Sequence, residues 1–192
     1  MTFYQKKREI IEAVVEAVRS SVAMVQIREK QLTAKQVFEL TSGAVAAAAG
    51  SVTLVLVNER FDIAMAAGAD GVHLRSNSMS PADIRSVTPR GFIIGVSTHS
   101  TNDAITARDR SADFAVLGPV FATPGKPAPI GLEELRKTCE LAGSFPILAL
   151  GGIDASNVRS VIQAGAAGFA AIRFMNSGAG SEFVREVKNV SK

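Results

Sequence analysis

The stretch Ala67-Gly68-Ala69-Asp70-Gly71-Val72 recurs as Ala164-Gly165-Ala166-Ala167-Gly168-Phe169, and Ser111-Ala112-Asp113-Phe114 echoes it more loosely. In each copy a small residue follows a helical pattern and precedes a short apolar run. This order is typical of the turn from a helix into a strand. A turn of this kind that recurs along one chain predicts a fold built from repeated βα units.

Short, almost wholly apolar runs alternate with helical spacing on both sides of these turns. They predict strands at residues 21–27, 53–57, 71–74, 92–96, 114–117, 146–150 and 168–172. Between them we expect helices, including one with a Thr33/Gln36 capping box, one that opens at Ser80-Pro81 and one capped by Asp154. Strands without a polar face are typical of a parallel sheet that helices cover on both sides.

The strand spacing favours a closed barrel over an open dinucleotide-binding sheet. The seven strand starts lie roughly 24 residues apart, against ~31 in an average eight-fold barrel, and no G-x-G-x-x-G follows a strand. An eighth strand would have to precede the first helix, where residues 2–5 are too few to cross a barrel. We therefore expect a single domain over residues 1–192: an α/β (βα)8 TIM barrel whose first strand is missing or lies before residue 1.

The composition argues against several classes of protein. Lys and Arg outnumber Asp and Glu by 21 to 18, and the chain has one Tyr and no Trp. Dispersed basic residues with so few aromatics argue against nucleic-acid binding. The single cysteine, Cys139, excludes an internal disulfide and a cysteine-based metal cluster. A polar start and the lack of a membrane-spanning apolar run predict a soluble, cytoplasmic protein with no membrane partner.

Polar residues at the strand exits are candidate site residues, because ligands of a βα barrel bind at the carboxyl ends of its strands. After the first strand Gln26, Arg28 and Lys30 alternate, so they would share the side that faces the barrel mouth. Two cations and an amide suit a pyrophosphate. The alternative, which spacing leaves equally open, is a strand-end salt bridge between Arg28 or Lys30 and a neighbouring acid.

The polar residues after the next three predicted strands are less specific signals of a binding site. Asn58-Glu59-Arg60 is also typical of a helix cap with first-turn charges. We interpret His73, beside an apolar run, as a core histidine. His99 is a candidate base, although a plain loop residue is favoured by spacing alone.

The last exits are rich in glycine and proline. Residues 118–127 form a long proline-rich segment with Lys126 near its end, typical of an active-site lid or of an ordinary surface loop. Gly151-Gly152 and Ile172-Arg173 follow the last two strands, where barrels commonly bind phosphate through backbone N–H groups. A Gly-Gly pair also makes ordinary tight turns.

Several motifs follow one another in register: VQIREK at 25–30, VN at 57–58, ADGVHL at 69–74, GVS at 95–97, GPVF at 118–121 with Thr123 and Lys126, and GGI at 151–153. Together they resemble the thiamine-phosphate synthase and thiazole tautomerase family, from about Val14 to Arg173. The resemblance implies a (βα)8 barrel whose first strand lies before Met1.

In the synthase branch, hydroxymethylpyrimidine pyrophosphate loses its pyrophosphate, and the nitrogen of thiazole phosphate attacks the resulting cation. The resemblance implies that the pyrimidine pyrophosphate is held by Gln26, Arg28, Lys30, Asn58, Ser97 and Lys126. Arg28, Lys30 and Lys126 would be the catalytic cations that neutralise the leaving group. The thiazole phosphate would be held by Thr123, Gly152, Ile172 and Arg173, with Gly151 beside them.

The chain departs from the family pattern in three ways. Glu59 and Ser78 stand where the synthase has two magnesium-binding aspartates, so Glu59 is the candidate ligand for a Mg²⁺ cofactor and Ser78 brings no charge. Gly125 replaces the second threonine of the synthase's Thr-x-Thr pair. Pro119 replaces the histidine of the tautomerase branch, for which His99 is a candidate substitute.

From these residues we rank a synthase-like transferase as the first candidate function and a tautomerase-like isomerase as the second. A non-catalytic regulator that binds a thiamine-pathway phosphate comes third, and another phosphate-binding barrel last. The expected partners are small phosphorylated or pyrophosphorylated heterocycles. The sequence leaves open whether the chain forms a homodimer.

Overall fold

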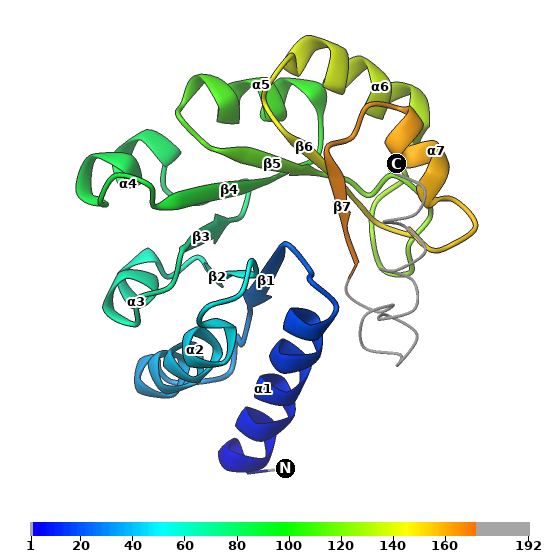
Figure 1. Cartoon of the computed structure of the whole chain (residues 1–192). Coiled ribbons are helices and arrows are strands. Elements are labelled where there is room, and N and C mark those ends of the chain that lie inside the picture. The colour runs from blue at the N-terminus through cyan, green and yellow to red at the C-terminus, as the bar shows by residue number, and fades with distance from the viewer. Residues whose placement is uncertain (1, 172–192) are drawn as a thin grey trace. The chain divides into compact units, whose positions relative to one another are not determined.

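The computed structural model describes residues 2–171, and the predictions for Ile172 and Arg173 lie outside these residues. Helices and strands alternate along the described chain (Figure 1). The helices are α1 (Phe3–Arg19), α2 (Ala34–Ala48), α3 (Phe61–Ala66), α4 (Pro81–Val87), α5 (Thr101–Asp109), α6 (Gly131–Ala142) and α7 (Val158–Gln163). The strands are β1 (Met24–Ile27), β2 (Leu54–Asn58), β3 (Gly71–Leu74), β4 (Ile93–Thr98), β5 (Phe114–Leu117), β6 (Ile147–Leu150) and β7 (Gly168–Ala170).

The chain divides into two compact units. Unit 1 contains the residues up to His73 together with Thr88–Ile93, and unit 2 contains Leu74–Val87 together with the residues from Ile94 onwards. In unit 1, β1 pairs with β2 and β2 with β3, each in parallel. In unit 2, β4, β5, β6 and β7 pair in that order, also in parallel.

The fold is therefore a parallel α/β fold, as the apolar runs predict. Its described residues contain seven strands, the number expected from the sequence, and not the eight of a complete (βα)8 barrel. The single domain over residues 1–192 stays a prediction.

The repeated turn has the backbone conformation that its sequence predicts. Gly68, Ser111 and Gly165 all have positive φ, at 71°, 67° and 94°, and each follows the end of a helix. In two copies an aspartate then accepts a hydrogen bond from the neighbouring strand: Asp70 from the N–H of Val55 and Asp113 from that of Ile94, each over 2.7 Å. The third copy has an alanine there, Ala167, and keeps the turn without the carboxylate.

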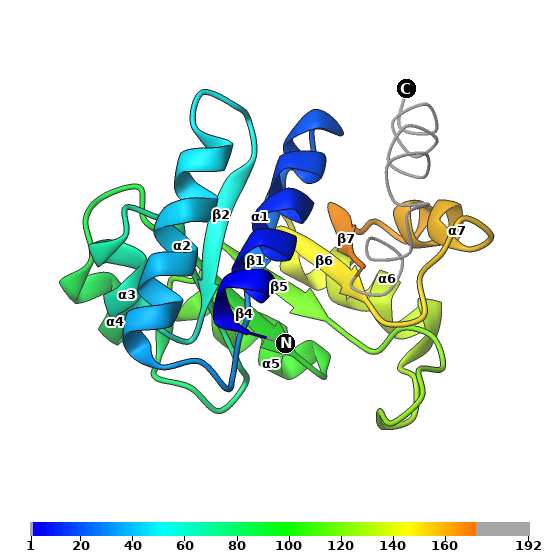
Figure 2. The same cartoon turned by 90° about the horizontal axis from the view of Figure 1, so that it is seen from below.

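Unit 1 is built around β1 and β2. Leu40, Val55 and Val72 are among its fully buried side chains. Both views show α1 and α2 side by side (Figures 1 and 2). Gly43 permits their close approach, since a Cβ there would lie 3.0 Å from Cδ1 of Ile11.

Unit 2 packs α5 and α6 along β5 and β6 (Figure 1). Its apolar core includes Leu117, Val120, Leu135, Ile147 and Val161, each at most 2% exposed. All four residues of β5 are buried, which agrees with the expectation of strands that lack a polar face.

Several boundaries differ from the sequence predictions. Residues 3–5, which were expected to precede the first helix, are helical, because Thr2 and Gln5 form a capping box at the start of α1. β1 begins at Met24 rather than at residue 21, since Ser21 has a left-handed φ of 50°. β4 extends to Thr98, which brings Ser97 into the strand. β7 ends at Ala170.

The predicted cap of the last helix is wrong. α7 begins at Val158 with Asn157 as its N-cap, whereas the Asp154 carboxylate accepts bonds from the backbone and hydroxyl of Ser156. This local aspartate turn competes with helix capping for the same carboxylate.

Within residues 2–171, no helix combines the length and hydropathy needed to cross a bilayer.

Candidate functional site

Three side chains on neighbouring strands of unit 1 form a chain of hydrogen bonds. Nε2 of Gln26, in β1, donates to Oδ1 of Asn58 at the end of β2, over 3.0 Å. Oε1 of Gln26 lies 2.9 Å from Nδ1 of His73 in β3. The register brings them together: Asn58 is the strand partner of His73, and it lies two residues beyond Leu56, the partner of Gln26.

Burial determines the charge state of His73. Desolvation and, less strongly, the charge of Arg28 lower the pKa of His73 from 6.5 to about 4, against an opposing effect of Glu59. The imidazole is therefore neutral near pH 7. Because Oε1 of Gln26 only accepts hydrogen bonds, Nδ1 of His73 carries the proton. His73 is thus largely buried and its ring is hydrogen-bonded, as expected of a core histidine; that its partner is Gln26 was not predicted.

Arg28 and Lys30 follow β1 and are both exposed. The acid between them, Glu29, forms its ion pair with Lys6 of α1, with 2.5 Å between Oε2 and Nζ. Within the part of the chain that the structure describes, neither Arg28 nor Lys30 takes part in an ion pair. The salt-bridge alternative considered for these two cations is therefore not observed there.

Glu59 directly follows Asn58, the last residue of β2. Its backbone is left-handed, with φ 65°, and its N–H donates to the carbonyl of His73 over 3.0 Å. Its carboxylate raises the pKa of His73, which offsets part of the effect of burial. In unit 1 the guanidinium of Arg28 and the carboxylate of Glu59 thus act in opposite directions on the pKa of the same buried imidazole, His73.

These residues offer Mg²⁺ few protein ligands. Among residues 2–171 no three His, Cys, Asp or Glu side chains are grouped as a metal site. Ser78 supplies only a hydroxyl, whose Oγ accepts the backbone N–H of Arg75 over 3.1 Å. Magnesium is often held by one or two carboxylates together with substrate phosphates. Glu59 fits such a substrate-bound ion; the donor set does not fit a magnesium ion held by protein ligands alone.

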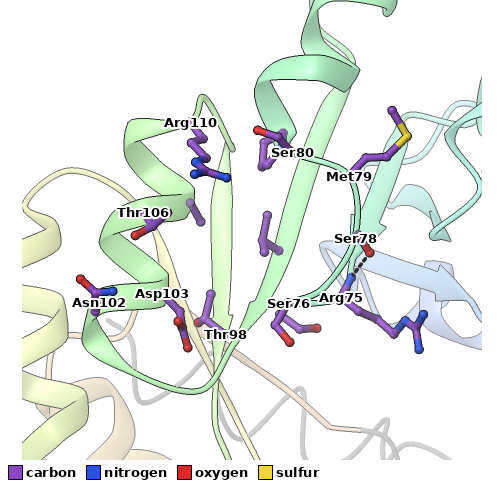
Figure 3. A pocket seen from close by; sticks show the side chains of 14 residues that line it. Arg75, Ser76, Ser78, Met79, Ser80, Thr98, Asn102, Asp103, Thr106 and Arg110 are labelled. Carbon is purple, nitrogen blue, oxygen red and sulfur yellow. Dashed lines mark hydrogen bonds between the residues drawn. The ribbon is translucent and has the colours of Figure 1, made fainter.

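Ser78 and Ser97 line one cavity of about 250 Å³ in unit 2. Figure 3 shows Asp103 and Thr106 of α5, together with Arg110 directly after it, on one side of the cavity. Its volume is below that of pockets which enclose drug-sized ligands, roughly 300–1,000 Å³. The cavity suits a single phosphate-sized group better than two heterocycles.

His99 is exposed but fixed at two points in unit 2. Its Nδ1 lies 2.7 Å from the carbonyl oxygen of Gly118, and its backbone N–H donates to Asp103 over 3.2 Å. Because a carbonyl only accepts, Nδ1 carries the proton in this bond. His99 therefore connects the exit of β4 to the segment after β5, a role between the loop residue and the base that the sequence suggested.

The segment after β5 packs closely against the Gly151-Gly152 turn after β6. Gly151 has φ 102°, and a Cβ there would lie 2.6 Å from Cβ of Pro119 and 3.3 Å from Oγ1 of Thr123. A Cβ on Gly152, with φ 63°, would lie 2.8 Å from Cβ of Phe121. Both positions therefore require glycine, for space as well as for backbone conformation.

Two further residues complete this part of unit 2. Asn157, which sequence reasoning missed, donates through Nδ2 to the carbonyl of Gly152 over 2.8 Å. Lys126 and Gly125 are exposed, and the backbone N–H of Lys126 donates to the carbonyl of Thr123 over 3.1 Å. An N-cap asparagine soon after a Gly-Gly turn was the available signal for Asn157.

The predicted site residues divide between the two units. Gln26, Arg28, Lys30, Asn58 and Glu59 belong to unit 1, and Ser97, His99, Thr123, Lys126 and Gly151-Gly152 belong to unit 2. That both groups act on one pair of substrates stays a prediction.

Polar groups at the carboxyl ends of parallel strands are typical of α/β proteins that bind ligands at this edge. The family model described as thiamine monophosphate synthase matches residues 2–175. The chain belongs to this family, which confirms the resemblance seen in the motifs.

Individual relatives support the same family assignment. The chain is 41% identical over 155 residues to the thiamine-phosphate synthase of Methanoculleus marisnigri, covering 78% of this chain and 72% of the relative. It is 35% identical over 177 residues to that of Neisseria meningitidis serogroup A, covering 91% and 85%. The solved thiamine phosphate pyrophosphorylase of Pyrococcus furiosus superposes with a TM-score of 0.84 at 31% identity, over 94% of this chain and 88% of that one.

These relatives carry the synthase or pyrophosphorylase name, and synthases of this family are transferases of thiamine biosynthesis. The ranking of a synthase-like transferase ahead of a tautomerase-like isomerase is confirmed.

Proposed function

We propose that this chain is a thiamine-phosphate synthase. It joins hydroxymethylpyrimidine pyrophosphate to thiazole phosphate: the bond from the pyrimidine methylene carbon to the pyrophosphate oxygen breaks, and its electron pair leaves with pyrophosphate. The thiazole nitrogen then donates its lone pair to that carbon and forms the new C–N bond. The products are thiamine phosphate and pyrophosphate.

The observation that carries this proposal is the pairing of Glu29 with Lys6 rather than with Arg28 or Lys30. Arg28 and Lys30 then neutralise the charge that develops on the departing pyrophosphate, which is the main electrostatic demand of such a reaction. Gln26 and Asn58, joined by their own hydrogen bond, supply amide groups beside these cations.

Other residues that the proposal assigns to the substrates belong to unit 2. Thr123 and the Gly151-Gly152 turn bind the phosphate of the thiazole, because glycine lets an anion approach the backbone closely. Lys126 and Ser97 add a cation and a hydroxyl for the pyrophosphate. In this proposal the fold is a (βα)8 barrel.

Magnesium enters the proposal as an ion that arrives with pyrophosphate. Glu59 is the carboxylate that would hold it, and when bound it would neutralise part of the charge on the leaving group. Ser78 contributes a neutral oxygen at most.

The direct test mixes the full chain with both substrates and magnesium and follows thiamine phosphate and pyrophosphate. Equal amounts of the two products support the synthase. Turnover of thiazole carboxylate phosphate alone would instead support an isomerase. Thermal stabilisation by either substrate with no turnover would support a non-catalytic regulator.

A further inference from the structure

The proposed anion site contains an acid in an unfavourable place. Glu29 lies in the chain between Arg28 and Lys30, the two cations that would hold pyrophosphate. A free carboxylate there would repel the anion, and it would also compete for the same cations. An anion site with this sequence therefore needs a way to neutralise Glu29.

Lys6 meets this requirement. Its Nζ lies 2.5 Å from Oε2 of Glu29, and the two side chains are only 31% and 19% exposed. Partial burial limits screening of the pair by salt. The other ion pairs within α1, Arg8 with Glu12 and Arg19 with Glu16, are longer and far more exposed.

The start of α1 fixes the position of Lys6. Oγ1 of Thr2 accepts the N–H of Gln5, and Oε1 of Gln5 accepts the N–H of Thr2, so the first turn is closed by a reciprocal pair of bonds. The backbone N–H of Lys6 donates to the carbonyl of Thr2 over 3.1 Å. Lys6 thus extends from an ordered helical turn rather than from a loose terminus.

We propose that Lys6 is a positioning residue for the anion site: it holds the Glu29 carboxylate and so leaves Arg28 and Lys30 available to pyrophosphate. Lys6 itself does not touch the anion. The inference rests on the proposed function, because it takes Arg28 and Lys30 as the pyrophosphate ligands.

The test measures the affinity of the full chain for inorganic pyrophosphate by calorimetry at low salt. The variants are Lys6→Met, Glu29→Gln and the double variant, with Arg8→Met as the matched control, since it breaks an exposed ion pair of the same helix. Lys6→Met should weaken binding about tenfold, because the freed carboxylate then opposes a multiply charged anion at close range. Glu29→Gln should bind at least as well as the unmodified chain, and Arg8→Met should bind equally.

The double variant shows whether Lys6 acts through Glu29 or independently of it. If Lys6 acts through Glu29, the double variant binds pyrophosphate within about twofold of Glu29→Gln, since no carboxylate remains to be neutralised. If Lys6 contacts the anion directly, or only stabilises α1, the double variant stays as weak as Lys6→Met and the inference is overturned. Equal affinity of Lys6→Met and the unmodified chain also overturns it. Failure of the unmodified chain to bind pyrophosphate would overturn the anion site itself, and with it both proposals.

Discussion

Nδ1 of His73 lies 2.9 Å from Oε1 of Gln26, so the third strand of unit 1 supports a side chain of the first across the strand between them. Nε2 of the same Gln26 amide donates to Asn58, on that middle strand. One neutral imidazole therefore helps to orient two amides that we assign to substrate binding. Because burial lowers the pKa of His73 and so favours its neutral form, the stability of this arrangement varies with pH.

Acidification should destabilise the protein through His73. Its pKa is about 4 in the folded chain against an ordinary 6.5. Between these values the unfolded chain binds more protons, so the free energy of unfolding rises with pH, and the stabilisation is complete above the unfolded value. The loss on going from pH 7 to pH 4 should reach at most about 3 kcal/mol.

Urea denaturation at pH 7 and at pH 4.5 measures this effect. His73→Gln should show a smaller loss of stability between the two pH values than the unmodified chain. The unmodified chain, measured at both pH values, is the reference for this difference. An equal loss in His73→Gln and the unmodified chain would contradict the assignment to His73.

Removal of the Arg28 guanidinium should weaken pyrophosphate binding. Arg28→Met should cost ~2–4 kcal/mol of binding free energy, the range of a lost charge-assisted contact. Calorimetry with pyrimidine pyrophosphate measures the change. Arg19→Met removes an exposed arginine of α1 and should leave the affinity unchanged. Equal affinities of Arg28→Met and the unmodified chain would reject Arg28 as a ligand.

Most of the fold could be predicted because its signals are local. The Thr33/Gln36 capping box forms as expected at the start of α2. The bounds of β3 and β5 agree with their apolar patterns. The prediction that Asp154 caps the last helix was wrong, because an aspartate can either close its own turn or cap a helix. Sequence alone does not decide between the two.

The site was predictable only in part. Strand exits identified Gln26, Arg28 and Asn58, because the end of a strand can be read from a pattern. The pairing of Glu29 with Lys6 joins a strand exit to a distant helix, so no local spacing reveals it. The neutral state of His73 depends on burial by surrounding elements, which periodicity does not measure.

The magnesium concentration that the coupling activity requires should depend on the residue at position 78. Its hydroxyl carries no charge, so any coupling activity should need more magnesium than a two-carboxylate site requires. Ser78→Asp should lower the half-saturating magnesium concentration about tenfold. Ser76→Asp adds the same charge to the same cavity two residues away and should have a smaller effect. Saturation of the unmodified chain at micromolar magnesium would contradict the prediction.

The Gly151-Gly152 turn should tolerate no side chain. Gly151→Ala places a Cβ 2.6 Å from Cβ of Pro119 at φ 102°, so the segment carrying Thr123 must move. We expect a loss of ~1–3 kcal/mol in the free energy of unfolding from strain and overpacking. The KM for thiazole phosphate should also rise, while the KM for pyrimidine pyrophosphate changes little, because the turn serves only the former substrate.

Gly50→Ala separates strain from function. Gly50 also has a positive φ, 75°, but a Cβ there would meet nothing within 4 Å. This variant should lose some stability from backbone strain alone and keep both KM values. If Gly151→Ala likewise changed stability but neither KM, the turn would be structural. The thiazole phosphate would then have to bind elsewhere, because the Thr123 segment moves in that variant without affecting its affinity.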